Sequence, residues 1–266
     1  MVAATGIVTA KLAVGGVGRV FPGVHGGPPT QALSPTTLHV ADNDFITILG
    51  PSGCGKSTLL RIVAGLDVPT TGRVLLDGAP VSGPGADRGM VFQSYTLFPW
   101  LTVRENIAFG LRERGVDRAR QAEIARYWIG KVGLAGFEEH FPKMLSGGMQ
   151  QRTAIARALA NDPKILLLDE PFGALDNQTR SLMQELLLGL WEAERKTILF
   201  VTHDIEEAIF MANRVVVMSA RPGRIKADVP VPLAHPRHYT IKTSPEFSAL
   251  KAELTEQIRV EALKVA

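Results

Sequence analysis

Short apolar runs alternate along this chain with longer segments whose apolar residues recur at helical spacing. Several of the runs end at a glycine or at acidic residues before the next helical pattern begins. Such alternation predicts an α/β fold with a mainly parallel sheet and helices on its faces. The segments expected to form strands are residues 7–14, 45–49, 74–76, 165–168, 197–201 and 215–218.

The middle of the chain has a different character. Between residues 102 and 160, Arg, Glu and Ala are abundant and β-branched runs are few, which predicts helices. Because this block lies between early and late strands of one sheet, we interpret residues 94–160 as a helical subdomain inserted into a unit that spans residues 1–235.

Residues 236–266 are expected to form a C-terminal helical extension. Ser244 provides an N-cap and Pro245 a first-turn proline, which together mark the start of a helix. Apolar residues follow at helical spacing and predict a helix that packs on the domain. These residues are Phe247, Leu250, Leu254 and Ile258.

Composition excludes several classes of protein. With 45% apolar residues in 266, the chain can bury a sizeable core, so it is neither disordered nor fibrous. The single Cys54 excludes an internal disulfide and a zinc cluster, and a net charge of +3 is too small to indicate nucleic-acid binding. No run reaches the about 20 apolar residues of a membrane span. Residues 1–20 lack a basic start and contain Lys11, so we expect no signal peptide and a soluble cytoplasmic domain.

A phosphate-binding loop follows the strand predicted at 45–49. Its glycines let backbone N–H groups converge on a phosphate, and the helix that begins near Lys56 adds its positive end. Lys56 can reach the β- and γ-phosphates, and the Ser57 hydroxyl can bind Mg²⁺. Cys54 is expected to have a structural role. The motif GxxxxGK[ST] consists of Gly50, Pro51, Ser52, Gly53, Cys54, Gly55, Lys56, Ser57 and Thr58.

Two carboxylates end the apolar run at 165–168. Acids at the carboxyl end of a buried strand lie where ligands bind in open α/β sheets. We expect Asp169 to hold Mg²⁺ directly or through water, and Glu170 to polarise the attacking water. Alone, the pair could be an ordinary strand-end turn. Together with the phosphate loop, it predicts the second half of a nucleotide site.

A second glycine-rich helix start occurs at residues 145–151. Ser146 is a fitting N-cap there, and an exposed helix N-terminus is a potential anion site. One nucleotide does not need two such sites in one chain. We therefore interpret this helix start as serving the nucleotide of another copy, with a plain helix cap as the alternative.

The order of these motifs resembles that of the ATP-binding subunit of ABC transporters. The resemblance covers about residues 7–225 and includes the phosphate loop, Gln93, LSGGMQQR (145–152), ILLLDEP (165–171), ALD (174–176) and His203. It implies an ATP-binding core with a mainly parallel sheet, an N-terminal antiparallel β portion and an inserted helical subdomain. It also implies two copies that hold two ATP molecules at their interface. Each ATP would lie between the phosphate loop of one chain and the other chain's Ser146, Gly147, Gly148 and Gln150.

The resemblance also assigns roles to single residues. Phe21 is similar to an aromatic residue that stacks on adenine, although the atypical loop at residues 23–30 follows it. Gln93 resembles a glutamine that contacts the metal and senses the attacking water. Asp176 resembles an aspartate that bridges the two chains, and His203 a histidine that contacts the γ-phosphate.

The implied mechanism consists of positioning and charge stabilisation. Lys56, Mg²⁺ and the loop amides neutralise the phosphates, while Glu170 orients or deprotonates water. Closure of the dimer supplies the other chain's helix N-terminus and excludes solvent. Hydrolysis and ADP release would then reopen the dimer.

Residues 95–102 carry several large apolar side chains in a loop-like segment. They could pack inside the helical subdomain, or they could line a groove for a helix of a membrane permease, which is the reading that the resemblance favours. Residues 219–225 (SARPGRI), with LFPW and FGALDNQTR, resemble the nitrate, sulfonate and taurine importer branch. A related importer for another small solute, such as a pyrimidine precursor, is the alternative.

The importer reading implies further partners and a place in the cell. We expect a permease, indirect contact with a periplasmic or surface solute-binding protein, and a peripheral position on the cytoplasmic face of the inner membrane. A non-transport ABC ATPase of the DNA-repair or ribosome type is less consistent, because this sequence has no long coiled coil, zinc cysteines or tandem ATP domain. A P-loop GTPase or small-molecule kinase would not explain LSGGMQQR, and no NKxD motif is present.

Overall fold

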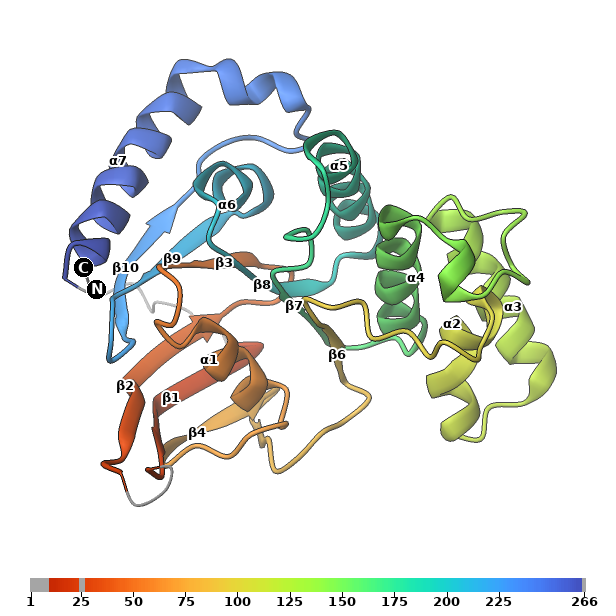
Figure 1. Ribbon diagram of the computed structural model, residues 1–266, viewed down its shortest axis with the longest axis horizontal. Coiled ribbons are helices and arrows are strands. Elements are labelled where there is room, and N and C mark those ends of the chain that lie inside the picture. The colour runs from red at the N-terminus through yellow and green to blue at the C-terminus, as the bar shows by residue number, and fades with distance from the viewer. Residues whose placement is uncertain (1–9, 24–26, 265–266) are drawn as a thin grey trace, which may run out of the picture.

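The computed structural model describes residues 10–23 and 27–264 and shows two sheets with helices around them (Figure 1). A four-stranded antiparallel sheet has the order β2-β1-β4-β5, and a six-stranded sheet has the order β10-β9-β3-β8-β7-β6. The strands of the first sheet are β1 (Leu12–Phe21), β2 (Thr30–Val40), β4 (Thr71–Leu76) and β5 (Ala79–Pro80). Those of the second are β3 (Phe45–Leu49), β6 (Arg88–Val91), β7 (Ile165–Asp169), β8 (Thr197–Thr202), β9 (Arg214–Met218) and β10 (Ile225–Pro230).

Strands β3, β7, β8 and β9 of this sheet match predicted segments closely, because their sequences are apolar on both faces, whereas β6 and β10 were not predicted. The bounds predicted for the first strand were wrong. β1 begins at Leu12 and continues to Phe21, and residues 7–9 of the predicted segment lie outside the described residues. β1 continues through Gly15 and Gly16, where its register shifts against both β2 and β4.

Two turns adopt the backbone that their residues favour. Asp77 and Gly78 have φ angles of 48° and 78°, as a two-residue hairpin turn between β4 and β5 requires. Asn43, which precedes β3, has φ 62°, a region that asparagine tolerates better than most residues.

The six-stranded sheet separates two hydrophobic clusters. Phe45 and Leu49 of β3 face the cluster that contains the other helices, whereas Ile46 and Ile48 face α1 and the antiparallel sheet. Because side chains alternate along a strand, this arrangement fixes which helices cover which face. The helices are α1 (Lys56–Val63), α2 (Val103–Glu113), α3 (Arg118–Lys131), α4 (Gly147–Ala160), α5 (Asn177–Glu194), α6 (Ile205–Met211) and α7 (Pro245–Ala262).

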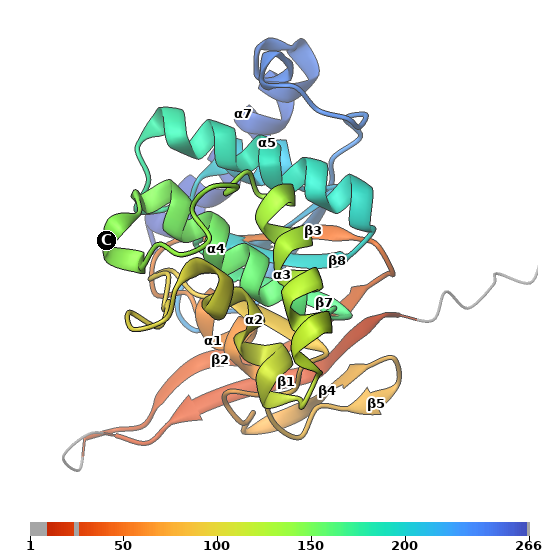
Figure 2. The same ribbon diagram turned by 90° about the vertical axis from the view of Figure 1, so that its right-hand side faces the viewer.

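Helices α2, α3 and α4 project from one side of the molecule (Figures 1 and 2), where the helical block was predicted. Thr102 begins α2 with a capping box, in which its hydroxyl accepts from the Glu105 amide and the Glu105 carboxylate accepts from the Thr102 amide. None of the helices in the described residues has the length and apolar character needed to cross a membrane.

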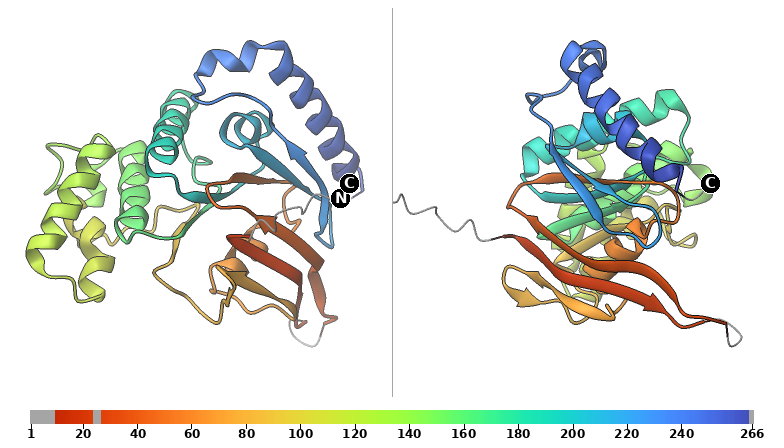
Figure 3. Two further views of the ribbon diagram at one scale, coloured as in Figure 1. Left: turned by 180° about the vertical axis from the view of Figure 1, so that it is seen from behind. Right: turned by 90° about the vertical axis from the view of Figure 1, so that its left-hand side faces the viewer.

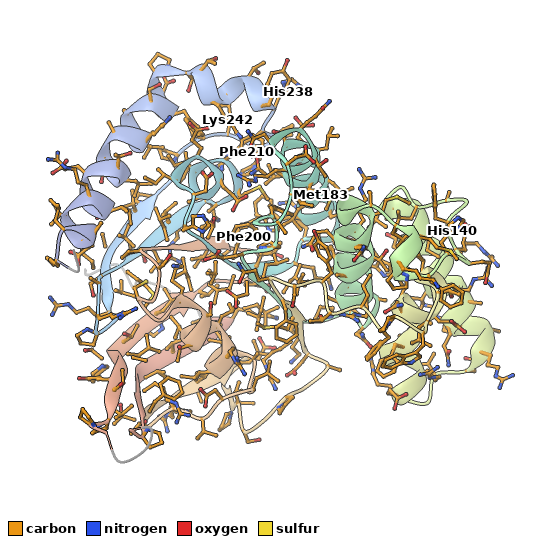
Figure 4. The ribbon with its side chains drawn as sticks, in the orientation of Figure 1. His140, Met183, Phe200, Phe210, His238 and Lys242 are labelled. Atoms are coloured by element: carbon orange, nitrogen blue, oxygen red, sulfur yellow. The ribbon has the colours of Figure 1, made fainter. Side chains whose placement is uncertain are left out.

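The segment that precedes α7 is held against α6 by hydrogen bonds and by a cation–π contact. The buried Arg237 donates to the carbonyls of Ile209, Phe210 and Ala212 and so satisfies the C-terminal end of α6. The Lys242 ammonium lies 4.7 Å from the centre of the Phe210 ring (Figure 4).

Helix α7 then runs beside α6, β9 and β10, as two opposite views show (Figures 1 and 3). As the sequence predicted, Ser244 caps the helix by accepting from the Phe247 amide. Phe247 and Leu254 are fully buried, and Leu250 and Ile258 pack partly buried against the same cluster.

The packing of α7 predicts a measurable contribution to stability. We expect Leu254→Ala to lower the free energy of unfolding by about 2–5 kcal/mol, because it leaves a cavity at a fully buried position. Leu263→Ala is the matched control, since Leu263 follows the same helix and is 67% exposed, and it should change stability by less than about 0.5 kcal/mol. Urea unfolding followed by circular dichroism measures both. Equal effects of the two substitutions would contradict this packing.

Candidate nucleotide-binding site

Three neighbouring parallel strands bring the predicted site together. In the order β3-β8-β7, the carboxyl ends of the strands meet at one edge of the sheet. The phosphate loop follows β3, His203 follows β8, and Asp169 and Glu170 lie at the end of β7. Residues separated by almost 150 positions are therefore adjacent because of strand order alone.

The phosphate loop has a backbone that requires glycine. Gly53 and Gly55 have φ angles of 73° and 92°, and Gly55 is the N-cap of α1. A Cβ on Gly55 would lie 2.7 Å from Cδ2 of Leu33 and 2.9 Å from the carbonyl of Ala32, so the loop packs closely on β2. The loop thereby presents backbone amides and the positive end of α1 at the sheet edge.

Lys56 and Cys54 are the buried side chains of this loop. The Lys56 ammonium donates to the carbonyls of Gly50 and Pro51, at 2.8 and 3.0 Å, and so spans the loop. Cys54 is 1% exposed, and burial raises the pKa of its thiol. A buried, protonated thiol is not reactive, which supports the structural role expected for Cys54.

Ser57 and Asp169 form a pair of oxygen donors. The Ser57 hydroxyl donates to Oδ1 of Asp169 at 2.8 Å. Burial raises the pKa of Asp169, as does the nearby Glu170 charge, whereas the hydrogen bond from Ser57 lowers it. Hydroxyl and carboxylate oxygens are ligands that Mg²⁺ accepts together with phosphate oxygens and water. Because the described residues contain no group of three or more His, Cys, Asp or Glu suited to a metal, most ligands would have to come from the nucleotide and water.

Glu170 and His203 are in direct contact. Oε2 of Glu170 lies 3.0 Å from Nδ1 of His203, and the Glu170 side chain is 19% exposed whereas that of His203 is 59% exposed. Glu170 has φ 44°, a strained value for a non-glycine residue, and its amide donates to the carbonyl of Val201. The His203 imidazole therefore holds the Glu170 carboxylate at the edge of the sheet where the attacking water would meet the γ-phosphate.

Gln93 belongs to the same edge. It follows β6, which pairs in parallel with β7, and its side chain is exposed. A Cβ on Gly173 would lie 3.9 Å from Nε2 of Gln93, which places the amide beside the turn that follows Glu170. The sequence did not predict β6, and only the fold brings Gln93 to this position.

The second glycine-rich helix start is not part of this edge in the same chain. Ser146 caps α4 by accepting from the Met149 amide at 3.3 Å and is exposed. Gly148 packs tightly on α5, since a Cβ there would lie 2.7 Å from Cγ2 of Thr179. Gln150 donates to the carbonyl of Leu145. Helix α4 packs on the face of the sheet opposite to α1, so Ser146, Gly147, Gly148 and Gln150 belong to a different surface.

Asp176 and Phe21 have local partners. Asp176 is exposed and caps α5, and the hydrogen bond from the Thr179 amide lowers the pKa of its carboxyl. Phe21 ends β1, and the guanidinium of Arg19 lies over its ring at 4.5 Å from the centroid. One face of the ring is therefore covered by a cation, and adenine stacking by Phe21 stays a prediction.

Sequence reasoning missed Arg221 as a neighbour of the phosphate loop. Its guanidinium Nε donates to the carbonyl of Gly53 at 3.3 Å. From the sequence, residues 219–225 were interpreted only as part of the resemblance to the nitrate, sulfonate and taurine importer branch. Pro222 and Gly223, between Arg221 and Arg224, indicate a turn, but no local pattern could show what Arg221 contacts, because that contact spans 168 positions.

With this geometry, similarity to known proteins becomes informative. Residues 33–173 match the protein family described as ABC transporter. An uncharacterized ABC transporter ATP-binding protein of Methanocaldococcus jannaschii is 53% identical over 254 residues, which are 96% of this chain and 93% of that protein. The chain belongs to the ABC transporter family.

Further similarities narrow this assignment. The nitrate import ATP-binding protein NrtD of Synechocystis sp. is 49% identical over 247 residues, 91% of this chain and 92% of that protein. The aliphatic sulfonates import ATP-binding protein SsuB of Bacillus thuringiensis subsp. konkukian is 49% identical over 230 residues, 85% and 88% of the two chains. A dimeric ATP-binding cassette solved in a post-hydrolysis state with ADP and Pi has a TM-score of 0.73 at 33% identity, over 84% of this chain and 100% of that one.

These findings confirm the predicted α/β cassette fold and the resemblance to the nitrate and sulfonate branch. The protein is an ABC-type ATPase, an enzyme of a family that powers transport, and it binds ATP. The edge formed by β3, β8 and β7 is therefore the candidate site of ATP hydrolysis.

The contact between Glu170 and His203 predicts the outcome of one isosteric substitution. Glu170→Gln keeps the size of the side chain and removes its ability to accept a proton from water. We expect ATP affinity to stay within about threefold, while steady-state ATP turnover falls by about 100-fold or more. Phosphate-release assays and equilibrium binding measure the two effects, with Glu185→Gln on α5 as a control. Near-normal ATP turnover in Glu170→Gln would contradict the prediction that Glu170 accepts a proton from the attacking water.

Proposed function

We propose that this ATPase energises the import of a small solute of the nitrate, aliphatic sulfonate or taurine type. Two copies bind two ATP molecules with Mg²⁺ at their interface and act on a membrane permease at the cytoplasmic face of the membrane. A periplasmic or surface solute-binding protein delivers the solute to that permease.

The separation of two anion-binding helix starts by the sheet is the observation that carries this proposal. The phosphate loop opens α1 on one face, and Ser146 opens α4 on the other. Figure 1 shows α1 and α4 on opposite sides of β7. A single chain therefore offers its own nucleotide only one of the two helix starts. A second copy related by a two-fold axis supplies the other to each nucleotide. The dimeric state of the similar solved cassette supports the same arrangement for this chain.

The chemistry assigned to the site follows from its contacts. Lys56 and the amides of the phosphate loop hold the phosphates, and Glu170 accepts the proton of the attacking water. His203 keeps the Glu170 carboxylate oriented, since their atoms lie 3.0 Å apart. Ser57 and Asp169 would hold Mg²⁺, which supplies charge neutralisation at the phosphate oxygens. Asp176, which is exposed and caps α5, is assigned to the interface between the copies.

A groove beside the helical subdomain is the site assigned to the permease. It has a volume of about 770 Å³ and lies between β6, the segment 95–98, α2 and α4. Arg157 donates to the carbonyl of Thr96 at 2.8 Å and lies over the ring of Phe98, which gives the groove a fixed wall. Phe98 is half-buried against Phe109 and Trp100, so the segment both packs on the subdomain and lines the groove.

Trp100 gives this docking surface an exposed aromatic anchor. It is 69% exposed, and its ring packs on Phe98 at the groove. We expect Trp100→Ala to weaken binding to the permease by about tenfold or more while ATP binding by the isolated chain is unchanged, because interface anchors are enriched in Trp. Tyr239→Ala, at a 57% exposed aromatic in the C-terminal segment, is the control. Pull-down with the detergent-solubilised permease measures both, and equal retention of the two variants would contradict the assignment of this groove.

The solute class rests on the two importer relatives at 49% identity. The ATPase itself does not contact the solute in this proposal, so the test is genetic. A strain that lacks the chain should fail to grow on taurine, an alkanesulfonate or nitrate as the sole sulfur or nitrogen source and should grow on sulfate and ammonium. Complementation by the wild type but not by Glu170→Gln should restore growth. Normal growth of the deletion strain on all three would overturn this solute class.

A further inference from the structure

The turn between β9 and β10, residues 219–224, packs between β2 and the phosphate loop. The amide of Gly223 donates to the carbonyl of Ala32 at 3.0 Å, and the carbonyl of Gly223 accepts from the Ser34 amide at 2.9 Å. A Cβ on Gly223 would lie 1.8 Å from the carbonyl oxygen of Cys54. Only glycine therefore lets this turn lie between β2 and the phosphate loop.

Arg221 lies in this turn and holds the phosphate loop from outside. Its Nε donates to the carbonyl of Gly53 at 3.3 Å, and its Nη2 would lie 2.5 Å from a Cβ on Gly53. A phosphate loop works by directing its backbone N–H groups at the phosphates, which requires the carbonyls to point elsewhere. A guanidinium that holds the Gly53 carbonyl therefore fixes the Gly53–Cys54 peptide, whose amide points to the inside of the loop and donates to the carbonyl of Pro51 at 3.4 Å.

Helix α7 fixes the turn that carries Arg221. Oε2 of Glu261 accepts from the Ala220 amide at 3.0 Å, and Oε1 pairs with Lys226 at 3.1 Å and with Lys264 at 2.6 Å. Glu261 is 1% exposed, and no local pattern on α7 required an acid there. Burial alone would raise the pKa of Glu261, but hydrogen bonds from Lys264, Ala220 and Lys226 lower it to about 2, so the carboxylate is charged at neutral pH. Figure 3 shows the last turns of α7 beside β9 and β10.

We propose that Arg221 is a positioning residue of the phosphate loop and that Glu261 on α7 sets its position through Ala220. The connection runs from a buried carboxylate on the last helix to the residue beside Arg221 and then to the carbonyl of Gly53. It acts on nucleotide affinity and leaves the hydrolytic step to Glu170. This inference rests on the ATP site proposed above.

The first test compares two arginines of the same turn in the full-length protein. We expect Arg221→Ala to raise the dissociation constant for Mg-ATP by roughly five- to tenfold. This is less than the full contribution of a charge-assisted hydrogen bond, because Arg221 contacts the loop and not the nucleotide. Turnover at saturating ATP should stay within about twofold, so KM changes and kcat does not. Arg224→Ala removes an equal charge from an exposed neighbour and should leave the dissociation constant unchanged. Arg221→Lys should restore most of the affinity, because its ammonium can donate to the same carbonyl.

The second test acts on Glu261. Glu261→Gln keeps an oxygen that accepts from the Ala220 amide, whereas Glu261→Leu does not. We expect the glutamine variant to bind ATP within about twofold of the wild type and the leucine variant to bind as weakly as Arg221→Ala. Thermal unfolding is measured beside calorimetric binding at a temperature where every variant is folded. A merely structural role would lower the midpoint temperature of Glu261→Leu without changing its affinity.

Several results would overturn this inference. One such result is that Arg221→Ala and Arg224→Ala bind ATP with the same affinity. Another is that Arg221→Ala lowers kcat while KM stays unchanged. If Arg221→Ala does not fold, equal ATP affinities of Glu261→Leu and Glu261→Gln decide against it. A wild-type chain that binds no ATP would instead contradict the proposed function, so the two failures are distinguishable.

Discussion

The convergence of parallel strand ends is the constraint on which the site depends. β3, β8 and β7 lie side by side, so the loops that follow them share one edge. The apolar faces of these strands bury against helices on both sides, and that burial holds the strand order. Hydrogen bonds of 2.8 Å between Ser57 and Asp169 and a contact of 3.0 Å between Glu170 and His203 are consequences of this order.

The same sheet also divides the binding surface. Because side chains alternate along β3, one face holds α1 and the antiparallel sheet and the other holds α4, α5 and α6. The helix start at Ser146 therefore serves a surface different from that of the phosphate loop. In the proposed two-fold symmetric pair of chains these two surfaces would face each other, so that ATP binding and dimer closure would be one event.

The phosphate loop depends on support from distant segments. β2 packs under Gly55, the β9–β10 turn packs on Cys54 and Gly53, and α7 holds that turn through Glu261. The contacts under Gly55 and on Cys54 are close backbone contacts and the hydrogen bond of Glu261 is buried, so these supports tolerate little displacement, whereas the hydrogen bond from Arg221 to Gly53 is exposed. The conformation of the phosphate loop is thus fixed by contacts with β2, the β9–β10 turn and, through that turn, α7. The glycines of the loop only allow the backbone angles that this conformation needs.

The sequence by itself determined the elements whose information is local. Strands β3 and β7, the loop GxxxxGK[ST], the acids at the end of β7 and the caps at Ser146 and Ser244 are each specified within a few residues, and the structure has these elements at the expected residues. Only the tertiary structure decided the extent of β1, the presence of β6 and β10, the cation over Phe21 and the contact of Arg221 with Gly53. These features arise from pairing between segments far apart in the chain. Hydrophobic period and capping chemistry report only on neighbouring residues, so they carry no information about such pairing.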